Sequence, residues 1–452
     1  MQLAAVYTDP WVLSGTALFV LVHLVLRYIR SDGRRLPPGP RGFPILGALP
    51  LVGPTPHTGL AALAQKHGPV MYLKMGTCGV VVASSPAAAR QFLKVQDARF
   101  ADRPAVASAV DITYGFQTIA FGMQGPRWKQ MRKLSTVHLL GAQAMSEWAS
   151  VRRDEAGRVL RDVAGASVGG ELVSVPDVLV RAFANIIGQI TLSKRLFDTQ
   201  GDEANRYKEM ITLVQSGSGL FNISDFVPAL SRFDLQGVQA KLRKIHLRFD
   251  DMISSLLDEH SATATQRQGR PDFIDKLRAS MADENKDSND ADTISEVNVK
   301  GFVFDMFTAG TDTASIIAEW ALAEMIKNPS IMARAQEEMD RVVGRGRRLE
   351  ESDVAGLPYL QARFLSGPTA SVDALGNCFE LIPFGAGRRI CVGKLAGMVF
   401  VQYFLGMLVH AFEWRLPEGE KLDMEEQFGL TMPKAVPLRA VATPRLAPAA
   451  YA

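Results

Sequence analysis

The order of hydrophobic and polar positions along the chain predicts a mostly helical protein with one early β-hairpin. Apolar and β-branched residues fill positions 70–74 and 79–84, and Met75-Gly76-Thr77-Cys78 between them has the composition of a turn. After residue 125 the spacing becomes helical, and Gly125-Pro126 is typical of a helix start. The predicted fold class is therefore mainly α with a small β portion.

One helix in the second half of the chain is predicted to be long enough to cross a whole domain. Thr293-Ile294-Ser295-Glu296 has the spacing of a capping box, and Asn328-Pro329 ends the helical pattern. The preceding polar stretch, residues 261–292, contains one short predicted helix at residues 273–281. Gly310 lies mid-helix, where glycine costs about 1 kcal/mol relative to alanine, so a distorted turn is expected.

An apolar segment without charge at residues 11–26 predicts a membrane anchor that extends to residue 29 if Arg27 snorkels to the interface. Residues 1–10 contain no Lys or Arg, whereas several arginines follow the segment, so the positive-inside rule places residues 1–10 in the lumen and the rest in the cytoplasm. Residues 30–44 are basic and rich in proline, which predicts a stiff hinge before the main domain at residues 45–452. The apolar run is short for a span, so a buried core helix is the alternative.

Composition mainly excludes function classes. With 452 residues, 47% of them hydrophobic, the chain is large and apolar enough for a substantial core. Its three cysteines, Cys78, Cys378 and Cys391, cannot build a disulfide framework and are typical of a reducing compartment. The formal net charge of +3, without a block of basic residues, argues against nucleic acid as a partner. A serine hydrolase is not supported, because no G-x-S-x-G motif occurs.

The most informative stretch is the decapeptide from Phe384 to Gly393, which reads F-x-x-G-x-R-x-C-x-G around Cys391. A thiolate that ligates haem iron must lie on a loop that can approach the porphyrin face, and Gly387 and Gly393 remove side chains there. Arg389 is placed to offer a cation to a haem propionate. The alternative is a buried structural cysteine in a glycine-rich turn.

The decapeptide resembles the haem-binding loop of the cytochrome P-450 superfamily of haem-thiolate monooxygenases. The resemblance implies a cytochrome P-450 fold behind one transmembrane helix, with haem b as cofactor and Cys391 as the axial ligand of its iron. Trp128 and Arg132 lie four residues apart on one helix face and match a W-x-x-x-R pair that the family uses to bind a propionate. Taken alone, such a pair is also common on ordinary surface helices. The anchor and the prolines resemble microsomal members, which implies a single-pass protein of the endoplasmic reticulum membrane.

The middle of the long helix contains Ala309-Gly310-Thr311-Asp312-Thr313, which resembles the family's A-G-x-D-T motif. A hydroxyl backed by a carboxylate can deliver the protons that dioxygen needs before its O–O bond splits, which implies catalytic roles for Thr313 and Asp312. Ala309 would leave room for substrate. One alternative is a mid-helix kink with a surface acid. Another is an oxygen-independent haem-thiolate isomerase, and the presence of Thr313 and Asp312 argues against it.

Further segments resemble plant hydroxylases of the flavonoid B ring. They are residues 125–129, 424–430 and 434–438, which are most similar to the 3',5'-hydroxylases, whereas Thr431 is more typical of the 3'-hydroxylases. The resemblance implies insertion of one oxygen atom of O2 into a small aromatic substrate of the flavonoid type, with Thr431 near that substrate. The number of hydroxylations stays open.

Electrons would come from an NADPH-dependent flavoprotein reductase. The chain has no G-x-G-x-x-G motif with which to bind a dinucleotide itself. Three basic residues, Lys129, Lys133 and Arg388, are candidates for the docking surface of that reductase. An ordinary solvated basic face is the alternative.

The resemblance breaks between Ala362 and Arg363. Residues 357–362 resemble the lead-in to a helix that carries E-x-x-R, yet residues 363–367 resemble the end of the later P-E-R-F segment, so the parts between them are missing. In the family that Glu and Arg pair with the P-E-R-F arginine and brace the cysteine loop, and Arg363 would be left without them. The hairpin would also lose the strands that extend its sheet and keep an open edge.

Two other E-x-x-R strings, Glu155 to Arg158 and Glu338 to Arg341, lie in the wrong context, and such pairs are ordinary on solvated helices. The gap therefore leaves a second interpretation open. The chain would then be a catalytically impaired isoform or a gene-model fragment with weak haem binding, as a skipped exon or an erroneous gene model would produce.

Overall fold

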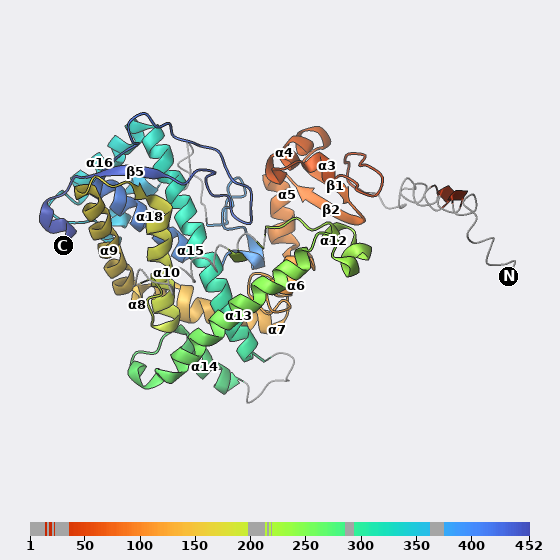
Figure 1. The fold of residues 1–452 in the computed structure, drawn as a ribbon, viewed down its shortest axis with the longest axis horizontal. Coiled ribbons are helices and arrows are strands. Elements are labelled where there is room, and N and C mark those ends of the chain that lie inside the picture. The colour runs from red at the N-terminus through yellow and green to blue at the C-terminus, as the bar shows by residue number, and fades with distance from the viewer. Residues whose placement is uncertain are drawn as a thin grey trace. The chain divides into compact units, whose positions relative to one another are not determined.

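The computed structural model describes residues 36–197, 219–284, 293–361 and 375–452, together with residues 14, 15, 18, 19, 22, 213, 214 and 217. The chain divides into two compact units, whereas one domain at residues 45–452 was predicted from the sequence. The first unit comprises Met1–Phe92 and Ile223–Phe233, and the second comprises Leu93–Asn222 and Asp234–Ala452. Figure 1 shows the fold of both units.

The first unit is built around the predicted hairpin, which is confirmed. Strands β1 (Val70–Met75) and β2 (Cys78–Ala83) pair antiparallel from Val70↔Ala83 to Met75↔Cys78. Met71 and Leu73 on β1 are fully buried and form a small core with Ala48. The accompanying helices are α3 (Leu49–Val52), α4 (Pro56–His67), α5 (Pro86–Arg90) and α12 (Ile223–Phe226).

The expected open edge of the hairpin is partly closed by the segment that was predicted to be a hinge. The Tyr72 N–H donates to the Pro38 carbonyl (2.9 Å), and the Ala48 N–H donates to the Lys74 carbonyl (2.6 Å). Gly39 allows this approach, because a Cβ there would overlap the Tyr72 carbonyl. The outer edge of β1 is therefore partly covered at Tyr72 and Lys74, while the sheet has two strands in the described part of the chain.

Three long helices form the centre of the second unit: α10 (Val175–Leu192), α15 (Glu296–Lys327) and α18 (Lys394–Ala411), which pack against one another (Figure 1). The ring of Phe183 on α10 lies with its centroid 5.1 Å from that of Phe400 and 4.9 Å from that of Phe404, both on α18. The other helices of this unit are α6 (Ala107–Ile112), α7 (Pro126–Ser135), α8 (Ala142–Glu147), α9 (Ala149–Val168), α13 (Val238–Ala262), α14 (Phe273–Glu284) and α16 (Pro329–Val342).

The second unit has one small sheet. Strands β3 (Val173–Ser174), β5 (Arg439–Pro444) and β4 (Phe412–Arg415) lie in the order β3-β5-β4, and both pairings are antiparallel. Val173 is paired with Ala440, and Phe412 is paired with Pro444. The fold is therefore mainly α with a small β portion, as predicted.

Helix α15 ends where the sequence predicts, and its N-cap lies two residues after the predicted cap Thr293. Ser295 is the N-cap, and its capping box is closed by Asn298 rather than by the pair of Thr293 and Glu296. The expected distortion at Gly310 is absent, because the helix runs without interruption through this residue. A Cβ on Gly310 would overlap the side chain of Ile187, so the glycine lets α10 pack closely on α15.

The predicted anchor at residues 11–29 lies outside the described residues apart from a few helical positions. Within the described part, α10 and α18 are long and apolar enough to cross a membrane, but two thirds of each is buried inside the protein. Their apolar faces are thus used by the core of the second unit. The junction at Ala362 and Arg363 also lies outside the described residues.

In both E-x-x-R strings the arginine is exposed, as expected, whereas the glutamate is buried, contrary to the expectation of a solvated pair. Glu155 is 2% exposed and accepts hydrogen bonds from Arg195 (2.6 Å) and Gln189 (3.0 Å). Glu338 is buried on α16 and accepts hydrogen bonds from the backbone N–H groups of Tyr359 and Leu360, at 2.8 and 3.0 Å. Both carboxylates therefore have structural partners that lie far away in the sequence.

Candidate functional site

The cysteine loop leads directly into the N-terminus of α18. The Cys391 N–H donates to the Phe384 carbonyl at 2.9 Å, which closes the loop, and Gly393 is the N-cap of the helix. The ring of Phe384 packs against the first turn of α18 at Gly397. A Cβ on Gly397 would lie 3.4 Å from this ring. Cys391 is an exposed, free cysteine, so the alternative of a buried structural cysteine is wrong.

Gly387 is required by the loop for a reason that the sequence did not reveal. It has φ +66°, and a Cβ there would overlap the Leu93 carbonyl. The close approach is thus to the protein's own backbone rather than to a cofactor. By contrast, a Cβ on Gly393 would lie 3.9 Å from the Cys391 sulfur, an ordinary van der Waals contact, so the protein itself leaves room for a side chain there.

Charged and polar groups around Cys391 act on its ionisation in opposite directions. The pKa of the Cys391 thiol is raised overall, because neighbouring atoms partly desolvate the sulfur although the residue is exposed, whereas a hydrogen bond from the Gly393 N–H and the charges of Arg132 and Lys394 oppose the rise. The position before the N-terminus of an 18-residue helix also favours a negative charge. The loop therefore offers a thiolate several compensating partners.

The predicted propionate ligands Trp128, Arg132 and Arg389 are brought together beside the cysteine loop. The guanidinium carbons of Arg389 and Arg132 lie 4.1 and 5.1 Å from the centroid of the Trp128 ring. Arg132 also donates to the Ile390 carbonyl at 2.7 Å, which ties α7 to the loop. The Trp128 indole is buried and donates to the Ile119 carbonyl at 3.0 Å, so here its N–H serves the backbone.

Arg103, Arg132 and Arg389 form a cluster beside the cysteine loop in which positive charge exceeds the negative charge of Asp102. Burial, together with repulsion from Arg103 and Arg132, lowers the pKa of Arg389 to about 10, while the charge of Asp102 opposes the shift. Arg389 donates to the carbonyls of Ala101 (2.6 Å) and Gly122 (2.5 Å), which hold it in place. An anion that entered this cluster would relieve the repulsion, which is what a haem propionate would do.

A buried acid that the sequence reasoning missed supports this cluster from the long helix. The Asp305 carboxylate on α15 accepts hydrogen bonds from the N–H groups of Ile119 (2.5 Å) and Ala120 (3.4 Å), the segment that carries the acceptor for Trp128. Desolvation raises the pKa of Asp305 to about 7, although both hydrogen bonds oppose the shift. The sequence signals this acid only by its position, as the one charged residue within the apolar run Val303 to Phe307.

The predicted distal residues lie along α15, and Thr431 joins them. Asp312 is half-buried and accepts a hydrogen bond from the Thr431 hydroxyl at 3.0 Å. Ala309 and Thr313 are both exposed on the same face of the helix, and the Thr313 hydroxyl donates to the Ala309 carbonyl at 2.7 Å. The structure therefore connects the substrate candidate Thr431 directly to the predicted proton carrier.

The three candidate docking residues differ in their surroundings. Lys129 and Lys133 are exposed one turn apart on α7. Arg388 instead donates from its side chain and its backbone to Asp97, at 3.0 and 3.2 Å, and the side-chain hydrogen bond lowers the pKa of that acid. Asp97 is a second residue that the sequence reasoning missed, since it lies far from the motif.

Curated relatives cover nearly the whole chain. Flavonoid 3',5'-hydroxylase of Solanum melongena is 42% identical over 96% of this chain and 96% of its own length. Flavonoid 3',5'-hydroxylase 2 of Petunia hybrida is 44% identical over 97% of this chain and 98% of its own length. Flavonoid 3'-monooxygenase of Arabidopsis thaliana is 38% identical over 97% of this chain and 98% of its own length. The first alignment spans 499 residues, which is more than the 452 residues of this chain.

Solved structures and the family model agree with these relatives. A zebra fish cytochrome P450 with progesterone superposes with a TM-score of 0.71 at 22% identity, over 86% of this chain and 99% of that chain. The same enzyme type with abiraterone gives 0.69 at 23% identity, over 86% of this chain and all of that chain. The model of the family described as Cytochrome P450 matches residues 37–364 and 362–437. The chain therefore belongs to the cytochrome P450 family.

Proposed function

We propose that this chain is a haem-thiolate monooxygenase that hydroxylates the B ring of a flavonoid. The relatives that cover almost all of the chain are named as flavonoid 3',5'-hydroxylases and a flavonoid 3'-monooxygenase, which supports both the reaction and the substrate class. The observation that carries the proposal is the exposed Cys391 at the start of α18, beside a cluster of arginines with excess positive charge. Thr431 leaves open whether one or two positions are hydroxylated.

The residues around the cysteine loop fit a haem group. Cys391 would ligate the iron, Arg132 and Arg389 would neutralise the propionates, and Phe384 would pack beside the loop. Trp128 would add a donor only if its indole left the Ile119 carbonyl, so its main role is to hold the two guanidinium groups. Haem bound through a thiolate supplies dioxygen activation.

Two residues of α15 would deliver the protons that the reaction with dioxygen requires. Thr313 would hold a proton at its Oγ1 atom near the reacting oxygen, and Asp312 would replace that proton from solvent through water. The Thr431 hydroxyl orients the Asp312 carboxylate, because it donates to Oδ2 at 3.0 Å. The small side chain of Ala309 would leave space for the aromatic substrate on the same helix face.

The electron source and the membrane are part of the same proposal. An NADPH-dependent flavoprotein reductase would dock on a surface that includes the exposed Lys129 and Lys133, whereas Arg388 is held by Asp97. Residues 11–29 would anchor the protein in the endoplasmic reticulum membrane in a single pass, with residues 1–10 in the lumen and the enzyme in the cytoplasm.

We also propose that the chain lacks an internal segment at the junction of Ala362 and Arg363. Two findings support it: the family model matches in two parts that meet at residues 362–364, and the alignment with the Solanum relative is longer than this chain. A chain without the bracing E-x-x-R helix would hold haem weakly. This observation favours a second candidate function, a catalytically impaired isoform.

The reduced, carbon monoxide-bound absorption spectrum tests both candidates. The chain as written and a version with the family's missing segment restored would be expressed in microsomes, with Cys391→Ala as the control. A thiolate-type Soret band and B-ring hydroxylation by the chain as written support the monooxygenase. A band in the restored version alone assigns this chain to the impaired isoform, and no band in either version refutes the haem-thiolate site.

A further inference from the structure

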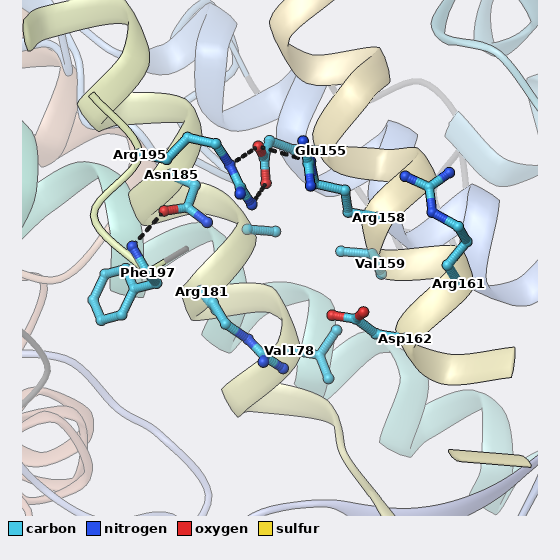
Figure 2. Close-up of a pocket in the computed structure, with 11 residues that line it drawn as sticks. Glu155, Arg158, Val159, Arg161, Asp162, Val178, Arg181, Asn185, Arg195 and Phe197 are labelled. Carbon is cyan, nitrogen blue, oxygen red and sulfur yellow. Dashed lines mark hydrogen bonds and ion pairs between the residues drawn. The ribbon is translucent and has the colours of Figure 1, made fainter. Parts of the chain in front are cut away.

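A cavity of about 280 Å³ between α9 and α10 is lined by four arginines and shares no lining residue with the candidate haem site. Arg158 and Arg161 come from α9, Arg181 from α10, and Arg195 from the segment after α10, as Figure 2 shows. We call this cavity the arginine pocket. It contains the Glu155 to Arg158 string, to which the sequence assigns no function.

The arginine pocket has excess positive charge. Its lining also contains two acids, Glu155 and Asp162, so two of the four arginine charges are not balanced within it. The Glu155 carboxylate already has a partner, because the Arg195 guanidinium donates to both of its oxygens, at 2.6 and 3.1 Å. Among the residues that the structure describes, Arg161 and Arg181 make no hydrogen bond or ion pair. The pocket therefore presents guanidinium groups that are not committed to protein acceptors.

A buried amide adds a fixed donor. Asn185 is 1% exposed, and its Oδ1 atom accepts hydrogen bonds from the N–H groups of Leu196 (3.0 Å) and Phe197 (2.9 Å). These two bonds determine which side of the amide faces the pocket, so the Nδ2 atom is directed inward (Figure 2). Within the described part of the chain Nδ2 has no protein acceptor, and it is not among the fully buried unpaired atoms, so it is accessible from the pocket.

We propose that the arginine pocket binds a phosphate group carried by a small molecule. The uncommitted groups of the pocket are almost all N–H donors, and its excess of two positive charges matches the charge of a phosphate monoester near pH 7. Planar guanidinium forks suit phosphate oxygens, which accept paired hydrogen bonds. Val159 and Val178 line the same pocket and provide apolar surface for the organic part of the ligand. The proposal does not depend on haem or on the hydroxylation reaction.

Isothermal titration of the full-length chain in detergent micelles with glycerol 3-phosphate tests this site. The wild-type protein is expected to bind with a dissociation constant below about 1 mM, and Arg181→Gln is expected to weaken binding at least about tenfold, because charge-assisted hydrogen bonds are lost. Arg158→Gln, at a more exposed position, should also weaken binding. It provides a second test of the pocket if Arg181→Gln does not fold. Arg153→Gln is the matched control, since Arg153 is exposed on the same helix outside the pocket.

The outcomes are distinct. The proposal is overturned if the wild type binds neither glycerol 3-phosphate nor vesicles with phosphatidic acid, if Arg153→Gln weakens binding as much as Arg181→Gln, or if succinate binds equally well. The phosphate group could belong to a lipid headgroup or to a soluble metabolite. Binding to vesicles with phosphatidic acid, compared with vesicles of phosphatidylcholine alone, distinguishes these two sources. Arg181-dependent binding to the acidic vesicles without binding of glycerol 3-phosphate assigns the phosphate to a lipid headgroup, and the reverse result assigns it to a soluble metabolite.

Discussion

Replacement of Asp305 by Asn should change how the stability of this protein depends on pH. The carboxyl group is fully buried on α15, and desolvation raises its pKa from 3.8 to about 7. The native state therefore binds this proton more tightly than the unfolded state does between those two values. Linkage then requires the free energy of unfolding to fall as the pH rises from about 4 to about 7, and to level off above.

The size of the effect follows from the shift of the pKa. A change from 3.8 to about 7 corresponds to about 4 kcal/mol, at 1.36 kcal/mol for each unit of pKa. Near pH 4 the wild-type group is neutral in the native state and resembles an Asn, which still accepts from the Ile119 N–H. The stability of Asp305→Asn relative to the wild type should therefore rise by about 4 kcal/mol between pH 4 and pH 8.

Urea unfolding of the full chain in micelles, followed by far-ultraviolet circular dichroism at several pH values, measures this difference. Using the difference between the two proteins cancels the titration of all other groups. Asp251→Asn, at an exposed position on α13, is the matched control and should show no such trend. A difference between wild type and Asp305→Asn that stays constant over this pH range would refute the reasoning.

Three further predictions concern the site and its support. Thr431→Val should lower the amount of product formed per NADPH oxidised, because it removes the donor to Asp312, whereas Thr431→Ser should retain the coupling; equal coupling in both variants would contradict the role of this hydroxyl. Gly310→Ala gains about 1 kcal/mol of helix propensity but displaces the terminal methyl of Ile187, so it should stabilise the protein more in an Ile187→Ala background than in the wild type, as measured by urea unfolding; equal effects in the two backgrounds would contradict the contact. Cys391→Ser should abolish a thiolate-type carbon monoxide band while the far-ultraviolet spectrum stays unchanged, and persistence of the band would exclude Cys391 as the ligand.

Features that depend on residues close together in the sequence were predicted well. The hairpin of β1 and β2, the start of α7 at Pro126 and the end of α15 at Lys327 all follow from turn and cap residues within a few positions. The reason for Gly310 could not be predicted, because it depends on Ile187 in another helix. The partner of Arg388 could not be predicted either, since Asp97 lies 291 positions away.

By itself the sequence determined the family and the mainly helical class, and it predicted the site residues, since a spaced motif around Cys391 is read within ten positions. Only the tertiary structure decided how these residues are supported. It brought Asp305 to the Ile119 backbone, Thr431 to Asp312, and Arg195 to Glu155. Local preferences set which element forms, whereas the partner of a buried charge is set by the packing of elements distant in sequence, because a buried carboxylate must have donors wherever the fold places it.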